Sequence, residues 1–295
     1  MSIAGIGIAV VGGDEREQEI ARLAAAEGAD VRAYGFPWPE DGIPGVQRAA
    51  TAAEALQGAR YALFPIPGLA ADGTLFAPGS PAPILPTAEL LENLAPGAHV
   101  ILGAADEHLR DAAAAAGVGL HEYEDDLELM LERGPAIVEG ALALTIENTR
   151  VTIHGSTVCV VGHGTIGSLL ARTLVLLGAR VTVAARNPVQ RAAARAAGAD
   201  AVELDLLHEL APGVAMLFST VPAPVVGRAV LERLPRGSLV MDLAAPPGGV
   251  DLDAARELGQ TAVWARGLGR RAPVTVGASQ WRGIQRRIDE LEEAR

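Results

Sequence analysis

The sequence contains no lysine, so all 24 of its basic residues are arginine. No amine side chain is therefore available to act as a general base or to form a Schiff base. Cysteine is almost absent too: Cys159 is the single one, which excludes a disulfide within the chain. Because Cys159 stands in an apolar, strand-like run, we expect it to be an inert core residue. No grouping of His, Cys and Asp has the spacing of metal ligands, so no metal site is expected.

Long apolar runs and a basic N-terminal segment are also missing. No run reaches the ~18 uncharged residues of a membrane span, and the start, MSIAGIGIAV, lacks the positive charge of a secretory signal. We therefore expect a cytoplasmic chain with no membrane partner. Aromatic residues make up only 3%, but 49% of the residues are apolar, which is enough for aliphatic cores in two domains. The net charge of −12 argues against nucleic acid as a partner.

One strand–turn–helix pattern occurs twice in the chain. Residues 9–31 read AVVGGDEREQEIARLAAAEGADV, and residues 159–181 read CVVGHGTIGSLLARTLVLLGARV. Strand-like and helix-like stretches alternate along the rest of the chain, which is typical of parallel, doubly wound sheets. The sequence therefore predicts an α/β fold with two Rossmann-like domains separated by a cleft.

The predicted domain boundaries follow from this repeat. Residues 1–137 would form an N-terminal, substrate-side domain, and residues 138–149 a helix that crosses to the second domain. Residues 150–277 would form the NADP-binding domain. The apolar periodicity of residues 278–295 predicts an amphipathic C-terminal helix that packs back on the N-terminal domain.

The second copy of the repeat carries the G-x-G-x-x-G pattern of a dinucleotide-binding turn. It follows a strand-like run and opens a helix, which is the context that the motif requires. The first glycine permits the tight turn, the second lets a pyrophosphate approach the backbone, and the third lets the helix pack on the strand. We expect His163 to lie at the loop surface near the cofactor rather than to act in catalysis. The predicted cofactor-binding residues of the turn are Gly162, His163, Gly164, Thr165, Ile166 and Gly167.

The end of the next strand predicts which cofactor is bound. An NAD-preferring site places Asp or Glu there for the ribose diol, but this chain has Arg186 followed by Asn187. A guanidinium at that place suits a 2′-phosphate, so NADP(H) is favoured and NAD is the alternative; a solvated strand-end arginine is the alternative role for Arg186. The ends of two later strands are expected to line the nicotinamide side, at Thr220, Val221, Pro222 and Ala244.

Taken together, these landmarks resemble the family of the dipicolinate synthase A subunit along nearly the whole chain. Order and spacing both agree, although no single piece would suffice. More widely, the chain resembles two-domain dehydrogenases that act on hydroxy and amino acids. The matching pieces are Gly12-Gly13-Asp14 with Arg16, Glu139-Gly140, Thr152-Ile153-His154-Gly155-Ser156, the three glycines of the turn, Ala185-Arg186, Thr220-Val221-Pro222, Asp242-Leu243-Ala244 with Pro247-Gly248-Gly249, and Gly267-Leu268 with Ala272-Pro273.

The resemblance implies an oxidoreductase of dipicolinic acid biosynthesis, a pathway of sporulation. Its substrate would be a small cyclic dicarboxylate, dihydrodipicolinate or its hydrated precursor, whose hydride passes to NAD(P)⁺ as the ring becomes aromatic. The resemblance also implies a partner, the flavoprotein-like B subunit of such a synthase. Analogy with related dehydrogenases suggests a homodimer.

Three departures from the family pattern keep other functions open. The family's Asn-Ser-Ile-Pro-Thr is replaced by the run 133–137, RGPAI, the arginine usual in its glycine turn is Thr165, and its C-terminal Pro-Gly and Pro-Lys-Thr become the shorter run 269–275, GRRAPVT. The cofactor half thus stays closer to the family than the substrate half. One alternative is a related dehydrogenase for another small carboxylate, and a second is a non-catalytic NADP-binding subunit or sensor.

Substrate contacts are predicted at two places. The first copy of the repeat supplies Gly13, Asp14 and Arg16 in a turn that matches the dinucleotide turn of the second copy. Because a planar guanidinium binds a carboxylate bidentately, Arg16 is a candidate for the substrate carboxylate; a surface arginine is the alternative. Asp14 is at least as well explained as the N-cap of the helix. Arg270 and Arg271, after the last strand, are the second group. One of them is expected to hold a substrate carboxylate or the cofactor, and a solvated basic loop is the alternative.

His154 and Arg133 are further candidates. His154 lies just before the nucleotide-binding strand and titrates near neutrality, so it is the candidate catalytic proton acceptor. A structural histidine bonded to the backbone is an equally good interpretation. Arg133, inside the altered run, is a weaker candidate for substrate contact.

Overall fold

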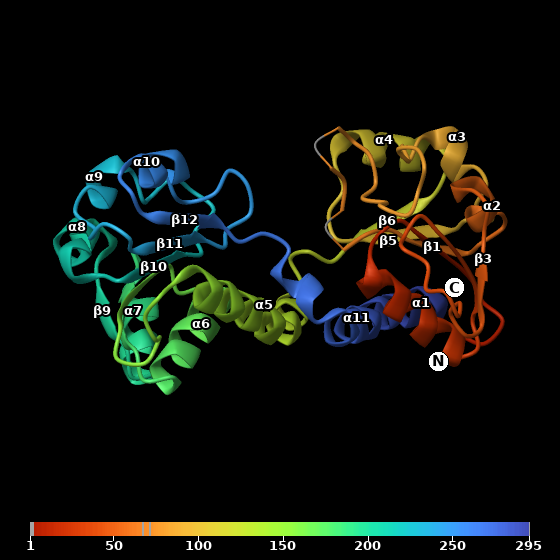
Figure 1. The fold of residues 1–295 in the computed structure, drawn as a ribbon. Coiled ribbons are helices and arrows are strands. Elements are labelled where there is room, and N and C mark those ends of the chain that lie inside the picture. The colour runs from red at the N-terminus through yellow and green to blue at the C-terminus, as the bar shows by residue number, and fades with distance from the viewer. Residues whose placement is uncertain (1–2, 67, 71, 295) are drawn as a thin grey trace. The chain divides into compact units, whose positions relative to one another are not determined.

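The computed structural model describes residues 3–66, 68–70 and 72–294. The chain divides into two compact units, Met1–Arg133 with Ala272–Arg295 (unit 1) and Gly134–Arg271 (unit 2). Each unit is built on a six-stranded sheet in which all the pairings are parallel (Figure 1). The predicted pair of Rossmann-like doubly wound sheets is confirmed.

Unit 1 has the strand order β3-β2-β1-β4-β5-β6. Its strands are β1 (Gly7–Val11), β2 (Asp30–Tyr34), β3 (Val46–Arg48), β4 (Tyr61–Leu63), β5 (His99–Leu102) and β6 (Gly119–Glu122). Its helices are α1 (Glu15–Ala26), α2 (Ala52–Leu56), α3 (Ala88–Leu91), α4 (Glu107–Ala115), the first part of α5 (Leu127–Asn148), and α11 (Pro273–Glu293).

Unit 2 repeats this topology with the order β12-β11-β10-β7-β8-β9. Its strands are β7 (Thr157–Val161), β8 (Arg180–Ala184), β9 (Asp200–Val202), β10 (Met216–Ser219), β11 (Leu239–Asp242) and β12 (Thr261–Trp264). Besides the rest of α5, its helices are α6 (Thr165–Leu176), α7 (Pro188–Ala196), α8 (Leu207–Leu210), α9 (Arg228–Leu231) and α10 (Leu252–Glu257), and three short 3-10 turns lie at Leu204–Leu206, Ala211–Gly213 and Leu268–Arg271.

The strands of unit 2 are apolar on both faces because helices cover both sides of a parallel sheet. In β7, Val158 and Val160 join one buried cluster with residues of α5 and α6. The alternate residues Cys159 and Val161 join a second cluster, with residues of α8 to α10, on the other face. Complete burial raises the pKa of the Cys159 thiol to about 12. Cys159 is therefore the inert core residue that the sequence predicts.

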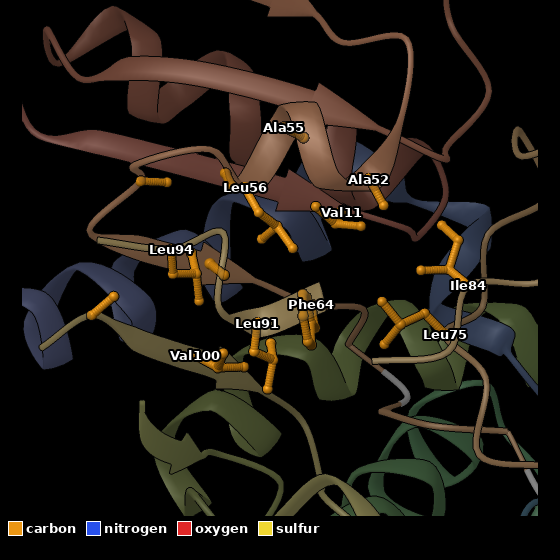
Figure 2. Close-up of a cluster of buried hydrophobic side chains, with 14 of the residues drawn as sticks. Val11, Ala52, Ala55, Leu56, Phe64, Leu75, Ile84, Leu91, Leu94 and Val100 are labelled. Carbon is orange, nitrogen blue, oxygen red and sulfur yellow. The ribbon is translucent and has the colours of Figure 1, made fainter. Parts of the chain in front are cut away.

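One face of the unit 1 sheet packs against short helices and the long loop before α3. Figure 2 shows Leu56 of α2, Leu91 of α3 and Val100 of β5 pointing into a common cluster, with Phe64 beside Leu91. Leu75, from the long loop, is buried in the same cluster. Helices of only four or five residues are stable here because each contributes a fully buried leucine rather than because of their length.

The C-terminal helix α11 packs against α1 in unit 1, which confirms the predicted return of the chain to its N-terminal part. Trp281 of α11 is 2% exposed, and its indole N–H donates to Glu27 Oε1 at 2.7 Å. Three arginines of α11 form ion pairs with acidic residues around the start of α5: Arg282 with Glu132, Arg286 with Glu128, and Arg287 with Asp126. Two neighbouring helices therefore hold α11 in place.

Helix α5 differs from the sequence prediction. The sequence predicts a crossing helix at residues 138–149 after a separate helix at 124–132, but one helix runs from Leu127 to Asn148 with Pro135 inside it. Proline removes one backbone hydrogen bond and disfavours the helix before it, but tertiary packing overrides that preference. Here Gly134 lies against Leu169 of α6 and Ala136 is buried, so packing continues through the Gly-Pro step. The two units divide at this step. Helix α11 likewise begins at Pro273, before the predicted residue 278, because proline suits the first helical position.

In the described part of the chain, no helix combines the length and the apolar character that a membrane crossing requires.

Replacing Trp281 with Ala should destabilise unit 1 by about 3–5 kcal/mol, because it empties a fully buried site between α11 and α1. Chemical denaturation followed by circular dichroism measures this change. Val274→Ala, an exposed position on the same helix, is the matched control and should change stability by less than about 0.5 kcal/mol. Equal effects of the two substitutions would contradict the packing described for α11.

A histidine pair on β5 and β6 predicts a dependence of stability on pH. His121 Nε2 lies 3.1 Å from His99 Nδ1, and the Tyr61 ring stacks on His99. Burial, and then the charges of His99 and Arg287, lower the pKa of His121 below its ordinary 6.5. The folded protein therefore favours neutral His121. The stability that the neutral pair contributes to the free energy of unfolding is present above pH 6.5 and is lost as the pH falls below it, because the unfolded chain then binds the proton more readily. The Tm of the wild type should fall more between pH 7.5 and about 5.5 than that of His121→Gln. If Tm falls equally with pH in both proteins, His121 does not cause the pH dependence.

Candidate functional site

The glycine-rich turn of unit 2 lies between the end of β7 at Val161 and the start of α6 at Thr165. Because the strands are parallel, the ends of β8, β10 and β11 meet at the same edge. Gly162 has φ +91, and a Cβ there would lie 2.7 Å from Thr220 Oγ1, so this residue must be glycine. A Cβ on Gly167 would lie 2.4 Å from the Gly162 carbonyl oxygen, which shows how closely α6 approaches the turn.

Helix α6 begins without a side-chain cap. Its N-cap is Gly164, no described side chain accepts a hydrogen bond from the helix start, and the first turn has no acidic residue. A Cβ on Gly164 would meet no described atom within 4 Å, so the backbone faces open space. N–H groups at a helix start form a ready anion site. The residues of this turn therefore fit the pyrophosphate of a dinucleotide.

The matching turn of unit 1 is closed by the protein itself. The Gly13 N–H donates to the Phe76 carbonyl at 2.6 Å. The Asp14 N–H donates to Glu17 Oε2 at 2.8 Å, and the Arg16 N–H donates to Asp14 Oδ1 at 3.1 Å. This is a capping box, in which the N-cap side chain and the residue three positions later satisfy each other's backbone. Asp14 is therefore the N-cap of α1, and the Gly13 N–H is engaged with the protein's own backbone.

Arg16 and Glu17 are buried charges beside this turn. The Arg16 guanidinium donates to both oxygens of Asp14, from Nε at 2.8 Å and from Nη2 at 2.9 Å. Burial acts to lower the pKa of Arg16, but the bond to Asp14 and the charge of Glu17 raise it above its ordinary value. Burial raises the pKa of Glu17, although its carboxylate accepts backbone bonds from Asp14 and Ile66. Arg16, predicted to bind substrate, thus already has a carboxylate partner.

Arg186 and Asn187 lie at the end of β8, as predicted, and are exposed. The Asn187 side chain accepts the Val189 N–H at 2.8 Å and caps α7. Arg191 reaches back from α7, donating from Nη1 to the Ala185 carbonyl at 2.9 Å and to the Arg186 carbonyl at 2.6 Å. Across residues 3–66, 68–70 and 72–294, no hydrogen bond or ion pair engages the Arg186 guanidinium. The charge is thus exposed at the position of the ribose 2′ substituent in dinucleotide-binding folds.

The loop after β11 is fixed by a buried aspartate. Asp242 accepts N–H bonds from Ala244 at 3.0 Å, Gly249 at 2.7 Å and Val250 at 3.2 Å. The Trp264 indole N–H donates to the Ala244 carbonyl at 3.1 Å. Sequence reasoning missed Trp264, although a tryptophan that ends a strand at the ligand-binding edge was a signal for it. The loop that carries Ala244 is therefore held from two sides.

The remaining residues predicted near the nicotinamide lie after β10. The Thr220 hydroxyl donates to the Val161 carbonyl at 3.1 Å, which ties β10 to the strand before the glycine turn. Val221 is half-buried and Pro222 is exposed. Together with Ala244 they form the adjoining part of the same sheet edge.

His163 does not lie at the loop surface, where the sequence predicts it. Its side chain is buried, and its Nε2 has no hydrogen-bond partner in the described part of the chain. Burial lowers the pKa of His163, which favours the neutral ring. The turn connects β7 and α6, which both contribute to the buried core of unit 2, so a side chain on the turn can be enclosed.

The position of His154 does not fit a catalytic proton acceptor. It precedes β7, so it lies at the edge of the sheet opposite the glycine turn, about 16 Å away along a five-residue strand. It is exposed, and its Nδ1 lies 3.3 Å from the Leu177 carbonyl oxygen. The structural alternative, a histidine bonded to the backbone, is the one the structure shows.

Arg270 and Arg271 form the end of the 3-10 turn that follows β12, and both are exposed. The Arg271 guanidinium donates to Glu139 of α5, so it already forms an ion pair within unit 2. Arg270 has an interaction partner as well. The ion pair between Arg271 and Glu139 therefore joins this basic loop to α5 within unit 2.

Two cavities of the described structure lie away from the two turns. These cavities, of about 420 and 460 Å³, flank the long loop of unit 1, and the described residues that line them include no predicted site residue. Within the residues that the structure describes, no group of three or more His, Cys, Asp or Glu side chains could hold a metal ion.

Comparison with known proteins places these two turns in context. A model of the N-terminal domain of the dipicolinate synthase A subunit matches residues 7–124, and a model of the D-isomer specific 2-hydroxyacid dehydrogenase NAD-binding domain matches residues 133–244. The second match covers the glycine turn and Arg186. Unit 2 therefore carries a nicotinamide-nucleotide-binding domain of the dehydrogenase type.

The similarity extends over the whole chain. The A subunit of dipicolinate synthase from Bacillus subtilis is 30% identical over 276 residues, 93% of this chain and 93% of that protein. The crystal structure of the same subunit from Bacillus halodurans has a TM-score of 0.90 at 28% identity and covers 97% of this chain and 98% of that one. That of the Bacillus subtilis protein has a TM-score of 0.87 at 28% identity, covering 99% and 98%. The chain belongs to the dipicolinate synthase A-subunit family.

Proposed function

We propose that this chain is an NADP-dependent dehydrogenase that oxidises dihydrodipicolinate, or its hydrated precursor, to dipicolinate. The observation that carries the cofactor choice is the exposed Arg186 guanidinium, which has no partner in the described part of the chain and lies on the same edge as the uncapped start of α6. Membership of the family supports the choice of substrate. Because the relatives are named as one subunit of a synthase, the proposal includes a second, flavoprotein-like subunit.

The residues of unit 2 have separate tasks in this proposal. The backbone N–H groups that follow Gly164 bind the pyrophosphate, and Arg186 binds the 2′-phosphate through charge-assisted hydrogen bonds. Asp242 and Trp264 hold the loop at Ala244 rigid beside the reacting ring. When bound, NADP⁺ supplies a hydride acceptor. Dihydrodipicolinate loses one hydride and one proton, and the hydrated precursor also loses one water molecule; the ring becomes aromatic, and NADPH is the second product.

A dehydrogenase for another small carboxylate is the second candidate. The observation that favours it is the run 133–137, RGPAI, in place of the family's Asn-Ser-Ile-Pro-Thr. In the structure, this run lies inside α5 and its first residue, Arg133, is buried. A buried guanidinium in place of small polar side chains changes the hydrogen-bonding groups available to a substrate, which favours a different small carboxylate.

Arg186→Asp should reverse the cofactor preference. The carboxylate would repel the 2′-phosphate and accept hydrogen bonds from a ribose diol, so NADPH affinity should fall at least about tenfold while NADH affinity rises. Titrations followed by nicotinamide fluorescence measure both affinities. Arg195→Asp, an exposed arginine near the other end of α7, is the control and should change the ratio little. An unchanged ratio in Arg186→Asp would remove Arg186 from this role.

Two glycine substitutions separate folding from cofactor binding. A methyl group on Gly164 faces open space, so Gly164→Ala should cost at most about 1 kcal/mol of stability and still weaken NADPH binding, because it occupies the approach to the backbone. Gly162→Ala should lose at least about 2 kcal/mol, because φ is positive and Thr220 is in the way. Calorimetry and NADPH titration test both. Full NADPH affinity in Gly164→Ala would place the pyrophosphate elsewhere.

The reaction itself is tested by mixing the purified chain with dihydrodipicolinate and NADP⁺, and recording the absorbance of dipicolinate and of NADPH. The assay is run with and without the B subunit from a relative. Equal amounts of the two products are expected. Tight NADPH binding with no dipicolinate formed in either mixture would reject this substrate and favour the second candidate.

A further inference from the structure

Unit 1 buries two polar side chains whose hydrogen-bonding groups are unpaired. Tyr123 is 2% exposed and Gln280 is 0% exposed. Neither the Tyr123 hydroxyl nor either atom of the Gln280 amide has a hydrogen-bond partner in the described part of the chain. Burying such groups unpaired costs free energy, so each one calls for a physical explanation, such as a functional role or a bound water, ion or ligand.

Tyr123 lies at the carboxyl-terminal end of β6, and Gln280 lies on α11, which packs on unit 1. Tyr123 follows the end of β6, and the guanidinium of Arg287 of α11 lies 5.8 Å from the centre of its ring. Gln280 lies on the same face of α11 as Gly283 and Arg287, at helical spacing. Gly283 packs closely on Leu129, near the start of α5. The amide and the hydroxyl therefore belong to one buried region between α11, α5 and β6.

Two buried arginines face this region. The charges of Glu17, Arg133, Glu124 and Arg16 all act on the pKa of the Tyr123 hydroxyl, which places it among them. Arg133 is buried, and its Nη2 donates to Glu124 Oε1 at 2.8 Å. Its Nε donates to the Met130 sulfur at 3.4 Å, a weak acceptor.

Glu124 is the exposed partner in its ion pair with Arg133. The arginine side chain is 10% exposed and the glutamate side chain is 46% exposed. An exposed carboxylate contributes little stability through such a pair and is easily rehydrated. A buried guanidinium without a carboxylate partner is strongly destabilising. A carboxylate from solution can therefore take the place of Glu124 without leaving Arg133 unpaired.

We propose that Tyr123, Gln280 and Arg133 bind a carboxylate of the substrate, and that this carboxylate replaces Glu124 at the Arg133 guanidinium. The Tyr123 hydroxyl and the Gln280 N–H₂ group supply the additional donors. With Glu124 released to solvent, the negative charge that enters equals the negative charge that leaves. Arg16 remains paired with Asp14 and supports the site electrostatically. The choice of ligand rests on the proposed function, whereas the site rests on the buried, unpaired groups.

The test compares stability with ligand affinity. The probe is pyridine-2,6-dicarboxylate, measured by titration calorimetry on the full chain, with the uncharged pyridine-2,6-dicarboxamide as the reference ligand. The wild type should bind the dicarboxylate and not the dicarboxamide. Tyr123→Phe and Gln280→Met should each weaken dicarboxylate binding at least about tenfold. Their Tm without ligand should stay unchanged or rise, because an unpaired buried group is removed.

Two further variants sharpen the result. Glu124→Gln should tighten dicarboxylate binding several-fold, because it removes the competing charge at Arg133. Tyr61→Phe is the matched control, since Tyr61 is a buried tyrosine of the same sheet whose hydroxyl donates to Glu292. It should leave dicarboxylate affinity unchanged. NADPH titration of all variants confirms that unit 2 is intact.

Three outcomes would overturn the proposal: no dicarboxylate binding by a wild type that binds NADPH, wild-type affinity in Tyr123→Phe, or a loss of Tm in Tyr123→Phe that parallels the loss of affinity. The proposed reaction can fail separately. If dihydrodipicolinate is not oxidised but the variants change dicarboxylate affinity as expected, the carboxylate site stands and only the reaction is rejected.

Discussion

In each unit, the first helix begins where the first strand ends, and its leading N–H groups need hydrogen-bond acceptors. Unit 1 supplies these acceptors from its own chain: Glu17 for Asp14, Asp14 for Arg16, and the Phe76 carbonyl for Gly13. The described residues of unit 2 supply no side-chain cap at Gly164. The same topology therefore gives one turn whose N–H groups are satisfied by the chain itself and one whose N–H groups are open to a ligand. The division between a cofactor unit and a second unit depends on this difference.

Because the turn of unit 1 is closed by the chain itself, the substrate contacts that we propose lie away from the start of α1. Arg16 is held by both oxygens of Asp14, so its charge is already balanced. The unpaired polar groups lie instead at Tyr123 and Gln280, on elements far apart in the sequence. Burial without partners lowers stability, and a protein retains such groups where binding requires them. Helix α11, held by Trp281 and by ion pairs to α5, brings Gln280 to this place.

Much of the fold was readable from the sequence because its signals are local. Strand–helix alternation, the repeat and the glycine pattern all depend on residues within one strand–turn–helix unit. The same holds for Arg186, whose place at the end of β8 is fixed by its distance from the glycine turn. Asp14 shows the limit: its sequence context suited both a cap and a ligand contact, and the capping box at Glu17 decided between them.

Local sequence signals were enough to predict two parallel α/β units, a nicotinamide-nucleotide turn between β7 and α6, and an arginine at the strand end beside it. Contacts between distant segments were needed to show that Phe76 closes the turn of unit 1, that His163 is buried, and that His154 lies at the opposite sheet edge. They were also needed to show that α5 continues through Pro135. The difference arises from separation along the sequence. Periodicity and turn chemistry depend on residues that are near neighbours in the chain, whereas burial and hydrogen-bond partners depend on distant segments that only folding brings together.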